Sequence, residues 1–322
     1  MVRTLLTRGV PLLLLYAVVL AGLNLGLIDD YLMATIATLC INIVLAVSLN
    51  LITGFTGQFS LGHAGFMAIG AYTTGLITIA VPTVPGFIAG LLAGGLLAAL
   101  VGFLIGLPTL RLRGDYLAIA TLGLAEIIRI LLNNVEFTNG AAGLAGIPQM
   151  MDWNWFFILT VGSVLLIRNF LRSSHGRNAI AVREDEIAAE SIGVDATRAK
   201  VLSFTVGAFF GGLAGGMYAS YFYFIKPDTF GFLKSIDILV IVVLGGLGSL
   251  SGSVIAAVLL AAISTVLQQF TAVRMILYAL LLVIIMVFRP QGLMGSREVS
   301  LRIVGRLFTR KPTEPDEPEA TR

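Results

Sequence analysis

Two short stretches of this 322-residue chain combine glycines with side chains that can hydrogen-bond, inside otherwise apolar sequence. Half-helix ends at such breaks present unpaired backbone N–H and C=O groups, which suit a zwitterionic solute in a wet cavity. The first break, GFTGQFSLGHAGF over 54–66, contains Gly57, Gln58, Ser60, Gly62 and His63. The second break, LGGLGSLSG over 244–252, contains Gly245, Gly246, Gly248 and Ser249. We interpret these nine residues as candidates for lining a translocation pathway.

A second interpretation of both breaks stays open, because small residues at such spacing also let membrane helices pack closely. For His63, a hydrogen-bonded histidine at the start of a helix is favoured over a ligand-binding one. Both breaks pass through a Ser-Leu pair, Ser60-Leu61 and Ser249-Leu250. This weak internal similarity suggests a repeat.

The elements that carry the breaks are apolar runs long enough to cross a bilayer. The chain is 57% hydrophobic and 12% charged, whereas soluble domains carry about 25% charged residues. We therefore predict an all-α, polytopic integral membrane protein. Ten helices are expected, at 10–28, 31–53, 60–81, 84–107, 115–133, 153–170, 199–224, 234–248, 251–270 and 272–289. The eighth is short, and we expect a half-helix that ends at Gly245 and Gly246.

The placement of basic residues predicts the orientation of these helices. With the N-terminus in the cytoplasm, only four of the 21 Lys and Arg residues fall toward the outside: Arg129, Lys226, Lys234 and Arg274. The positive-inside rule then predicts cytoplasmic N- and C-termini. We expect residues 1–290 to form the transmembrane domain and 291–322 a cytoplasmic tail whose proline-rich acidic end is disordered.

Signatures of catalysis are missing from the sequence. GxxxxGK[ST], HExxH and CxxC do not occur, and Cys40 is the single cysteine. We therefore expect no catalytic residue, no metal site and no cofactor. Glu126 and Arg129 are spaced to pair on one helix face. The sequence has no regular series of acidic residues of the kind that forms a proton relay. This makes the hypothesis of an ion-driven transporter weaker without excluding it.

The inner loop 171–200 is the longest charged segment that looks structured. Asn178 is expected to cap a helix over 179–192 that Gly193 ends, and Asp195 to cap the following span. Its charges and narrow face suit docking in a groove of a soluble partner, although a merely solvated loop fits as well. The candidate coupling residues are Arg183, Glu184, Asp185, Glu186, Ala188, Ala189 and Gly193.

Several stretches together resemble the branched-chain amino-acid permease family of ABC importers, and most of all its LivM-type branch. They are TGFTGQFSLGHAGFMAIGAY, RGDYLAIATLGLAEIIR, TNGAAGLAGIP, GRNAIAVREDEIAAESIGV, LGGLGSLSGSVIAA and FRPQGL, in family order from about residue 35 to 295. The resemblance implies a non-catalytic subunit of the bacterial inner membrane. The implied partners are a second related permease, two cytoplasmic ATPase subunits and an external solute-binding protein, with no nucleic acid.

The resemblance also places the inner loop near the coupling loop of ABC importers. Here the spacing from Glu186 to Gly193 is one residue longer than that pattern, and its Ile-x-Leu-Pro portion is not evident. Leucine, isoleucine and valine are the expected solutes. Urea, short amides or other amino acids are the alternative, and a stand-alone ion-coupled transporter is a further one.

Overall fold

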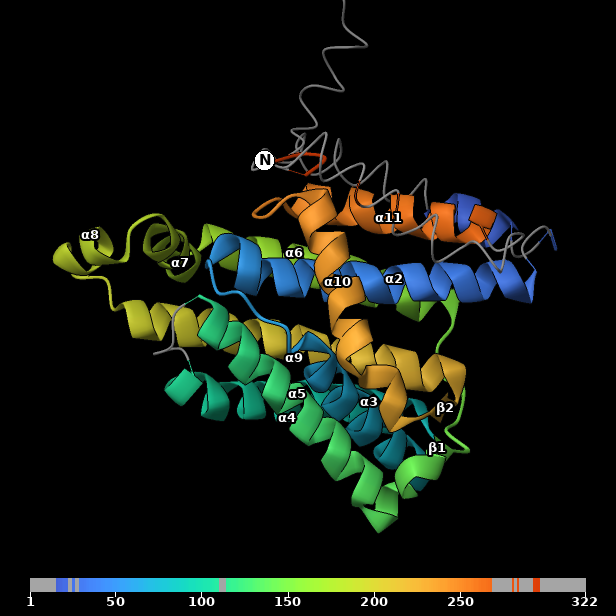
Figure 1. Ribbon diagram of the computed structural model, residues 1–322. Coiled ribbons are helices and arrows are strands. Elements are labelled where there is room, and N and C mark those ends of the chain that lie inside the picture. The colour runs from blue at the N-terminus through green and yellow to red at the C-terminus, as the bar shows by residue number, and fades with distance from the viewer. Residues whose placement is uncertain are drawn as a thin grey trace, which may run out of the picture.

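The computed structural model describes residues 16–22, 25–26, 29–109, 114–267, 280, 283 and 292–295. The described chain is helical apart from a two-stranded antiparallel ribbon that joins β1 (Leu144–Ala145) to β2 (Phe224–Ile225). The long helices are α2 (Asp30–Asn50), α3 (His63–Ala80), α4 (Val84–Thr109), α5 (Asp115–Asn134), α6 (Trp153–Arg172), α9 (Ala196–Phe222), α10 (Phe232–Gly245) and α11 (Leu250–Leu267) (Figure 1).

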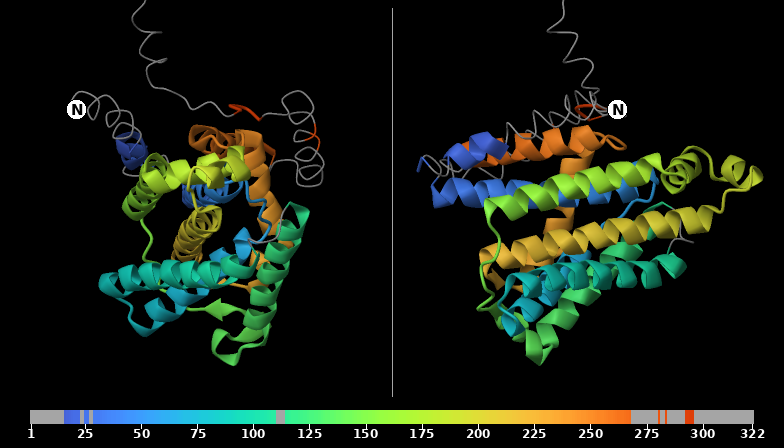
Figure 2. Two further views of the ribbon diagram at one scale, coloured as in Figure 1. Left: turned by 90° about the vertical axis from the view of Figure 1, so that its left-hand side faces the viewer. Right: turned by 180° about the vertical axis from the view of Figure 1, so that it is seen from behind.

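Shorter elements connect these helices. They are a π-helix, η1 (Leu51–Phe55), the helices α7 (Ser174–Glu184) and α8 (Glu186–Ser191), and three 3₁₀ turns, η2 (Glu136–Thr138), η3 (Gly140–Ala142) and η4 (Pro227–Phe230). Helices α7 and α8 project from one end of the molecule (Figure 2), and the ribbon lies toward the other end (Figure 1). The molecule therefore has an α7 end and a ribbon end.

The predicted helices at 31–53, 84–107, 115–133 and 153–170 agree closely with the structure. The first predicted span is described as helix only over 16–22, and the tenth, 272–289, lies outside the described residues apart from positions 280 and 283. Four described helices are long and apolar enough to cross a membrane. An all-helical membrane protein is thus confirmed, while the number of crossings has to be revised for the pair α10 and α11.

The chain turns by 118° between α10 and α11. At this angle α11 runs mostly across the end of α10 and does not continue in its direction (Figure 1). With 14 residues, α10 is about 21 Å long, short of the roughly 30 Å of a bilayer core. The structure therefore favours one bent unit, either a broken span or a re-entrant hairpin, over the two separate crossings predicted at 234–248 and 251–270.

Close helix packing through glycine builds the core of α3, α4 and α9. A β-carbon placed on Gly70 would lie 1.8 Å from the carbonyl oxygen of Gly212, and one on Gly215 would lie 1.9 Å from that of Met67. Backbones this near exclude every residue larger than glycine. The sequence analysis named close helix packing as one possible role of glycine. The contact between α3 and α9 is an example of that role.

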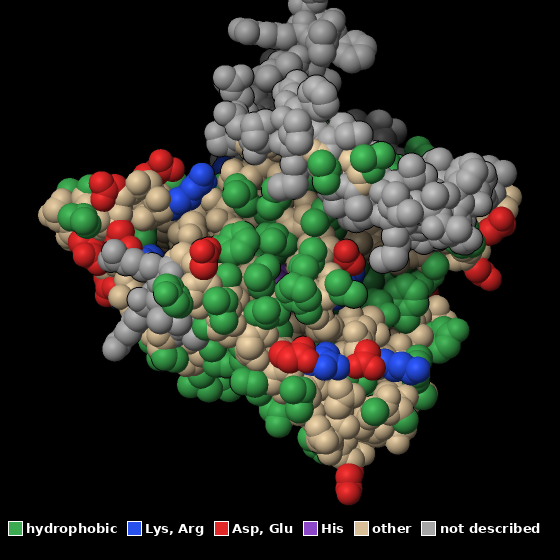
Figure 3. Space-filling view, in the orientation of Figure 1, with side chains coloured by type: hydrophobic (Ala, Val, Ile, Leu, Met, Phe, Trp, Pro, Cys, Tyr) green, Lys and Arg blue, Asp and Glu red, His purple; other side chains and the backbone are tan. Residues whose placement is uncertain are grey.

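Apolar side chains cover much of the molecular surface (Figure 3). On α4, Leu96, Leu100 and Leu104 repeat every four residues and are 62%, 53% and 58% exposed. This spacing places them on one face of the helix, where lipid can contact them. Acidic side chains gather instead over α7 and α8 (Figure 3).

Candidate functional site

The first break starts where α2 ends. The helix widens into the π-helix η1, whose last turn is closed by the Gln58 N–H donating to the Ile52 carbonyl at 3.1 Å. Gly57 then adopts φ +72°, a left-handed conformation that glycine adopts without steric cost. The chain reaches α3 only at His63. The predicted interruption of the helix is therefore present, and it spans the residues that the sequence singled out.

Side chains of two other helices hold the start of α3. The Leu61 N–H donates to Thr121 Oγ1 of α5 at 3.0 Å, and the Ala64 N–H donates to Ser235 Oγ of α10 at 3.2 Å. A β-carbon on Gly62 would lie 2.2 Å from the Thr121 carbonyl oxygen. The backbone of the first break is thus fixed between α5 and α10, and Gly62 is required for close approach.

His63 is fully buried at the first position of α3. Its Nε2 lies 2.8 Å from Ser48 Oγ, and its ring packs edge-on against Phe66. Ser60 is buried as well, with its Oγ 3.4 Å from the Gly62 N–H. His63 therefore has the hydrogen-bonded, helix-start position that was favoured for it.

The second break is held by one buried side chain, Asn50. Its Nδ2 donates to the Ser249 carbonyl at 2.9 Å and to Ser253 Oγ at 2.8 Å, and its Oδ1 accepts from the Gly248 N–H at 2.9 Å. Helix α10 ends at Gly245 as predicted, and Gly246 has φ +110°. The end of α2 and the second break thus form one joint.

Residues 292–295 pack on the same joint. The Leu293 N–H donates to the Leu244 carbonyl at 2.7 Å, and the Met294 N–H donates to the Gly245 carbonyl at 3.2 Å. These two carbonyls end α10 and have no partner within it. The four candidate pathway residues of the second break, Gly245, Gly246, Gly248 and Ser249, are all buried. In this conformation they serve packing.

Two cavities open on the described residues. The ribbon cavity, about 410 Å³, lies beside η4 and the start of α10 and is lined among others by Glu126, Arg129, Asp228, Phe232, Lys234 and Asp237. The α7 cavity, about 270 Å³, is lined among others by Gly57, Gln58, Leu117, Arg183, Glu184 and Lys200. Of the candidate pathway residues, only Gly57 and Gln58 line either cavity.

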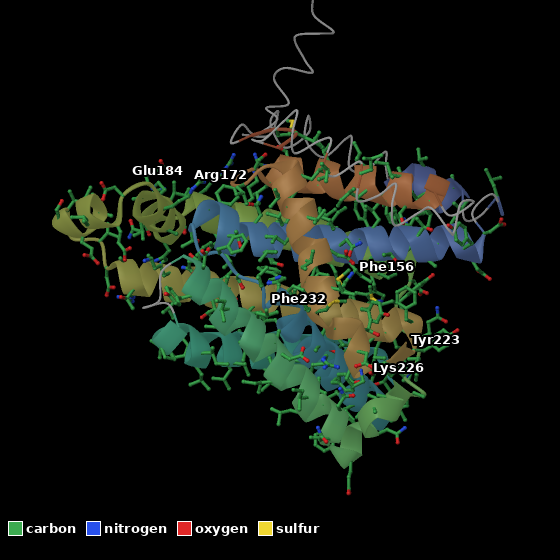
Figure 4. The ribbon with its side chains drawn as sticks, in the orientation of Figure 1. Phe156, Arg172, Glu184, Tyr223, Lys226 and Phe232 are labelled. Carbon is green, nitrogen blue, oxygen red and sulfur yellow. The ribbon has the colours of Figure 1, made fainter. Side chains whose placement is uncertain are left out.

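Helix α5 contributes lining residues to both cavities. Leu117 lines the α7 cavity and Arg129 lines the ribbon cavity, about 18 Å apart at 1.5 Å per residue. Thr121, which holds the first break, lies between them on the same helix. Figure 4 labels one lining residue of each cavity, Glu184 for the α7 cavity and Phe232 for the ribbon cavity. The start of α3 is thus bonded to α5 at a level between the residues that line the two cavities.

Gln58 is a buried polar residue whose side chain lines a cavity. Its side chain is 3% exposed and lines the α7 cavity, and neither Oε1 nor Nε2 has a hydrogen-bond partner among the described residues. A buried amide without partners is costly. Its amide is therefore available to a polar group that enters the α7 cavity.

The inner loop differs from the prediction at its helix boundaries. Ser173 caps α7 by accepting from the Gly176 N–H at 3.3 Å, so Asn178 lies inside the helix and its predicted cap is wrong. The single helix 179–192 is also wrong, because Asp185 is extended at φ −156° and caps α8 through the Ala188 N–H at 3.0 Å. The predicted stop at Gly193 (φ +90°) and the cap by Asp195 are confirmed.

Several candidate coupling residues contact their own chain. Ala189 is 3% exposed and packs with Val182, Ala196 and Ala199. Lys200 Nζ lies 2.6 Å from Glu186 Oε1. These contacts fix α8 on α9. The exposed apolar side chains of this region are Ile187 and Ile192, each 77% exposed, which the sequence analysis did not single out.

Arg183 reaches from α7 to both breaks. A β-carbon on Gly57 would lie 3.2 Å from Arg183 Cγ, and one on Gly248 would lie 2.7 Å from Arg183 Nη1. One side chain of the inner loop therefore contacts two segments almost 200 positions apart. Sequence reasoning assigned Arg183 to a soluble partner, and it had no signal for Asn50 beyond a polar residue in an apolar run.

Comparisons with known proteins agree with these features. Residues 31–288 match the family described as "Branched-chain amino acid transport system / permease component". The chain is 39% identical to the high-affinity branched-chain amino acid transport system permease protein LivM of Escherichia coli (strain K12), over 83% of this chain and 71% of that protein. LivM of Salmonella typhimurium is also 39% identical, over 82% and 70%.

The permease protein LivH of Escherichia coli (strain K12) is 26% identical, over 80% of this chain and 92% of LivH. No solved structure matches the chain significantly. The family match covers both breaks, the inner loop and α5. The chain therefore belongs to the family of permease components of branched-chain amino acid transport systems.

Proposed function

We propose that this chain is the membrane-spanning permease subunit of an ABC importer for branched-chain amino acids. Its non-catalytic role is to form part of the translocation pathway and to couple that pathway to separate ATPase subunits. The observation that carries the proposal is the pair of cavities at two levels of α5, with the start of α3 bonded to α5 at a level between them. Alternating access needs such an arrangement, with a movable barrier between two openings.

In this proposal the start of α3 is the barrier between the cavities. The Leu61 N–H donates to Thr121 of α5 and the Ala64 N–H donates to Ser235 of α10, in addition to the buried contacts of Gly62 and His63. A shift of α5 or α10 breaks these bonds without unfolding α3. Arg183 gives α7 a direct contact with Gly57, next to this barrier. A ligand shifts such an equilibrium only through different affinities for the two states, and here ATP supplies that difference on the partner subunits.

The docking surface for an ATPase subunit is the exposed edge of α8. Ile187 and Ile192 are each 77% exposed, which suits insertion into an apolar groove of a soluble protein. The α7 end then faces the cytoplasm of a bacterium, with the chain spanning the inner membrane several times. The ribbon end faces an external solute-binding protein. A second, LivH-like permease completes the pathway, since LivM and LivH are both permease proteins of this transport system.

The decisive experiment is reconstitution in liposomes. The chain with a sister permease, two ATPase subunits and a solute-binding protein from the same genome is expected to take up leucine only with ATP. Gradient-driven uptake by this chain alone would instead establish an ion-coupled transporter. Uptake of urea or short amides in place of leucine would show that the importer carries a different class of solute.

The docking surface has its own test. Replacing both Ile187 and Ile192 by aspartate is expected to remove the ATPase subunits from the purified complex. The matched control is Thr197→Asp, an exposed position at the start of α9, and the ATPase subunits are expected to stay bound. Retention of the ATPase subunits by the double aspartate variant would place docking elsewhere.

A further inference from the structure

The ribbon cavity contains two sets of charges that differ in how they are paired. In the first set, Arg129 pairs with Glu126 one turn earlier on α5 and with Asp228 of η4, its Nη1 lying 2.6 Å from Asp228 Oδ1. One guanidinium thus serves two carboxylates. This triad has its partners within the chain and needs no ligand.

The second set, Lys234 and Asp237 on α10, forms no salt bridge within the described residues. The hydrogen bond of Lys234 Nζ goes to a neutral oxygen, Asn42 Oδ1, at 3.2 Å. Within the described part of the chain, no carboxylate oxygen lies within 4.0 Å of Lys234 Nζ, and the Asp237 carboxylate accepts no hydrogen bond. Charges in a membrane segment are costly and most often mark a ligand or ion pathway.

The spacing of this pair fits a zwitterion. Lys234 and Asp237 are three residues apart on one helix, which brings their β-carbons to about 5–6 Å, and both line the ribbon cavity. The ammonium and carboxylate of an α-amino acid are attached to one carbon, so both can reach into the space between two such side chains. An amino acid can therefore bring its carboxylate to Lys234 and its ammonium to Asp237 at the same time.

The rest of the cavity suits an aliphatic side chain. Phe232 and Leu233, at the start of α10, line it and are 46% and 73% exposed. A volume of about 410 Å³ lies in the range of small-molecule sites, roughly 300–1,000 Å³. Neutral solutes such as urea or a short amide would leave both charges of the pair without a partner.

We propose that Lys234 and Asp237 are the recognition site of this permease for the α-carboxylate and α-ammonium of an aliphatic amino acid. The proposal rests on the proposed import function and adds its solute contacts. It makes the ribbon cavity a selectivity filter for zwitterions, in addition to any selection by an external binding protein.

The test is equilibrium binding to the complete transporter in nanodiscs, without the solute-binding protein. Three probes are compared: leucine, 4-methylpentanoate, which lacks the ammonium, and 3-methylbutylamine, which lacks the carboxylate. Lys234→Met and Asp237→Asn are each expected to weaken leucine binding about tenfold. Lys234→Met should leave 3-methylbutylamine unaffected, and Asp237→Asn should leave 4-methylpentanoate unaffected. Lys226→Met is the control, since Lys226 lies over the Phe224 ring and is not part of the cavity lining.

Several outcomes would overturn the proposal. Wild-type leucine affinity in both variants would do so, as would absence of leucine binding to the unmodified complex, or equal weakening of all three probes. If the Lys234→Met complex does not assemble, Asp237→Asn decides alone, because Asp237 is exposed and forms no hydrogen bond or salt bridge with the described residues. ATP-driven leucine uptake by the unmodified complex is measured in parallel, so that the import function can stand when the recognition site fails.

Discussion

The two glycine breaks look alike in sequence but differ in their surroundings. The first contains an exposed glycine, Gly57, and a buried amide, Gln58, that has no hydrogen-bond partner in the described part of the chain. Both residues line the α7 cavity. In the second, Asn50 bonds to three groups of the turn, and residues 292–295 bond to the end of α10. At Gly57 glycine permits an open turn beside a cavity, whereas at Gly245 and Gly246 it permits close backbone contact.

This difference separates two uses of the same residue type in a membrane protein. Where the polar backbone is satisfied from inside the protein, a break is a mechanical joint. Where a cavity lies beside it, the same kind of break can meet water or solute. We therefore expect mutations in the second break to act first on stability, and mutations in the first break to act first on transport.

The largest effect is expected for Asn50→Leu. The substitution removes the partners of the Gly248 N–H and the Ser249 carbonyl, both buried, and should lower the free energy of unfolding by about 3 kcal/mol. The measurement is thermal unfolding of the purified complex in mild detergent, with Asn134→Leu at an exposed site as control. Normal stability with lost transport would instead place the second break in the pathway.

The next effect is expected for Gly57→Leu. A leucine at φ +72° is strained by about 1–2 kcal/mol, and its side chain would displace Arg183 and fill part of the α7 cavity. ATP-driven uptake should fall about tenfold, one tenfold step per 1.4 kcal/mol, while complex recovery is retained. Gly123→Leu is the control, because nothing lies within 4 Å of a β-carbon there. Equal loss of uptake in both variants would remove the distinction between the breaks.

A smaller effect on efficiency is expected for Arg183→Ala. Loss of the contact from α7 to both breaks should reduce leucine taken up per ATP hydrolysed about fivefold, with the ATPase subunits still bound. The control on the same helix is Arg177→Ala, whose side chain donates to the Arg172 carbonyl at 2.7 Å. Unchanged uptake per ATP would show that Arg183 only packs between the breaks.

The smallest effect is expected for Ser235→Ala. It removes one hydrogen bond to the start of α3, so stability should fall by about 1 kcal/mol or less. Leucine uptake should change less than twofold, since Thr121 still holds Leu61. Ser174→Ala, at an exposed site on α7, serves as reference for both measurements. A loss of stability as large as that of Asn50→Leu would mean that the first break is also a structural joint.

Local pattern accounts for most of what could be predicted. The end of α10 at Gly245, the pairing of Glu126 with Arg129 and the cap by Asp195 each depend on residues within a few positions. The prediction that Asn178 caps α7 was wrong, because Ser173, five residues earlier, caps the helix instead. Two acceptable caps near each other cannot be ranked without the packing of the helix they start.

By itself the sequence determined an all-helical membrane chain, two polar interruptions and a charged inner loop, because hydropathy and glycine act over short distances. Only the tertiary structure decided that one break is sealed while the other borders a cavity, that Arg183 contacts both, and that Lys234 and Asp237 share a cavity with a closed ion triad. The physical reason is the range of the contacts. Asn50 and Gly248 are 198 positions apart, and no local pattern specifies which distant backbone a buried amide will bond.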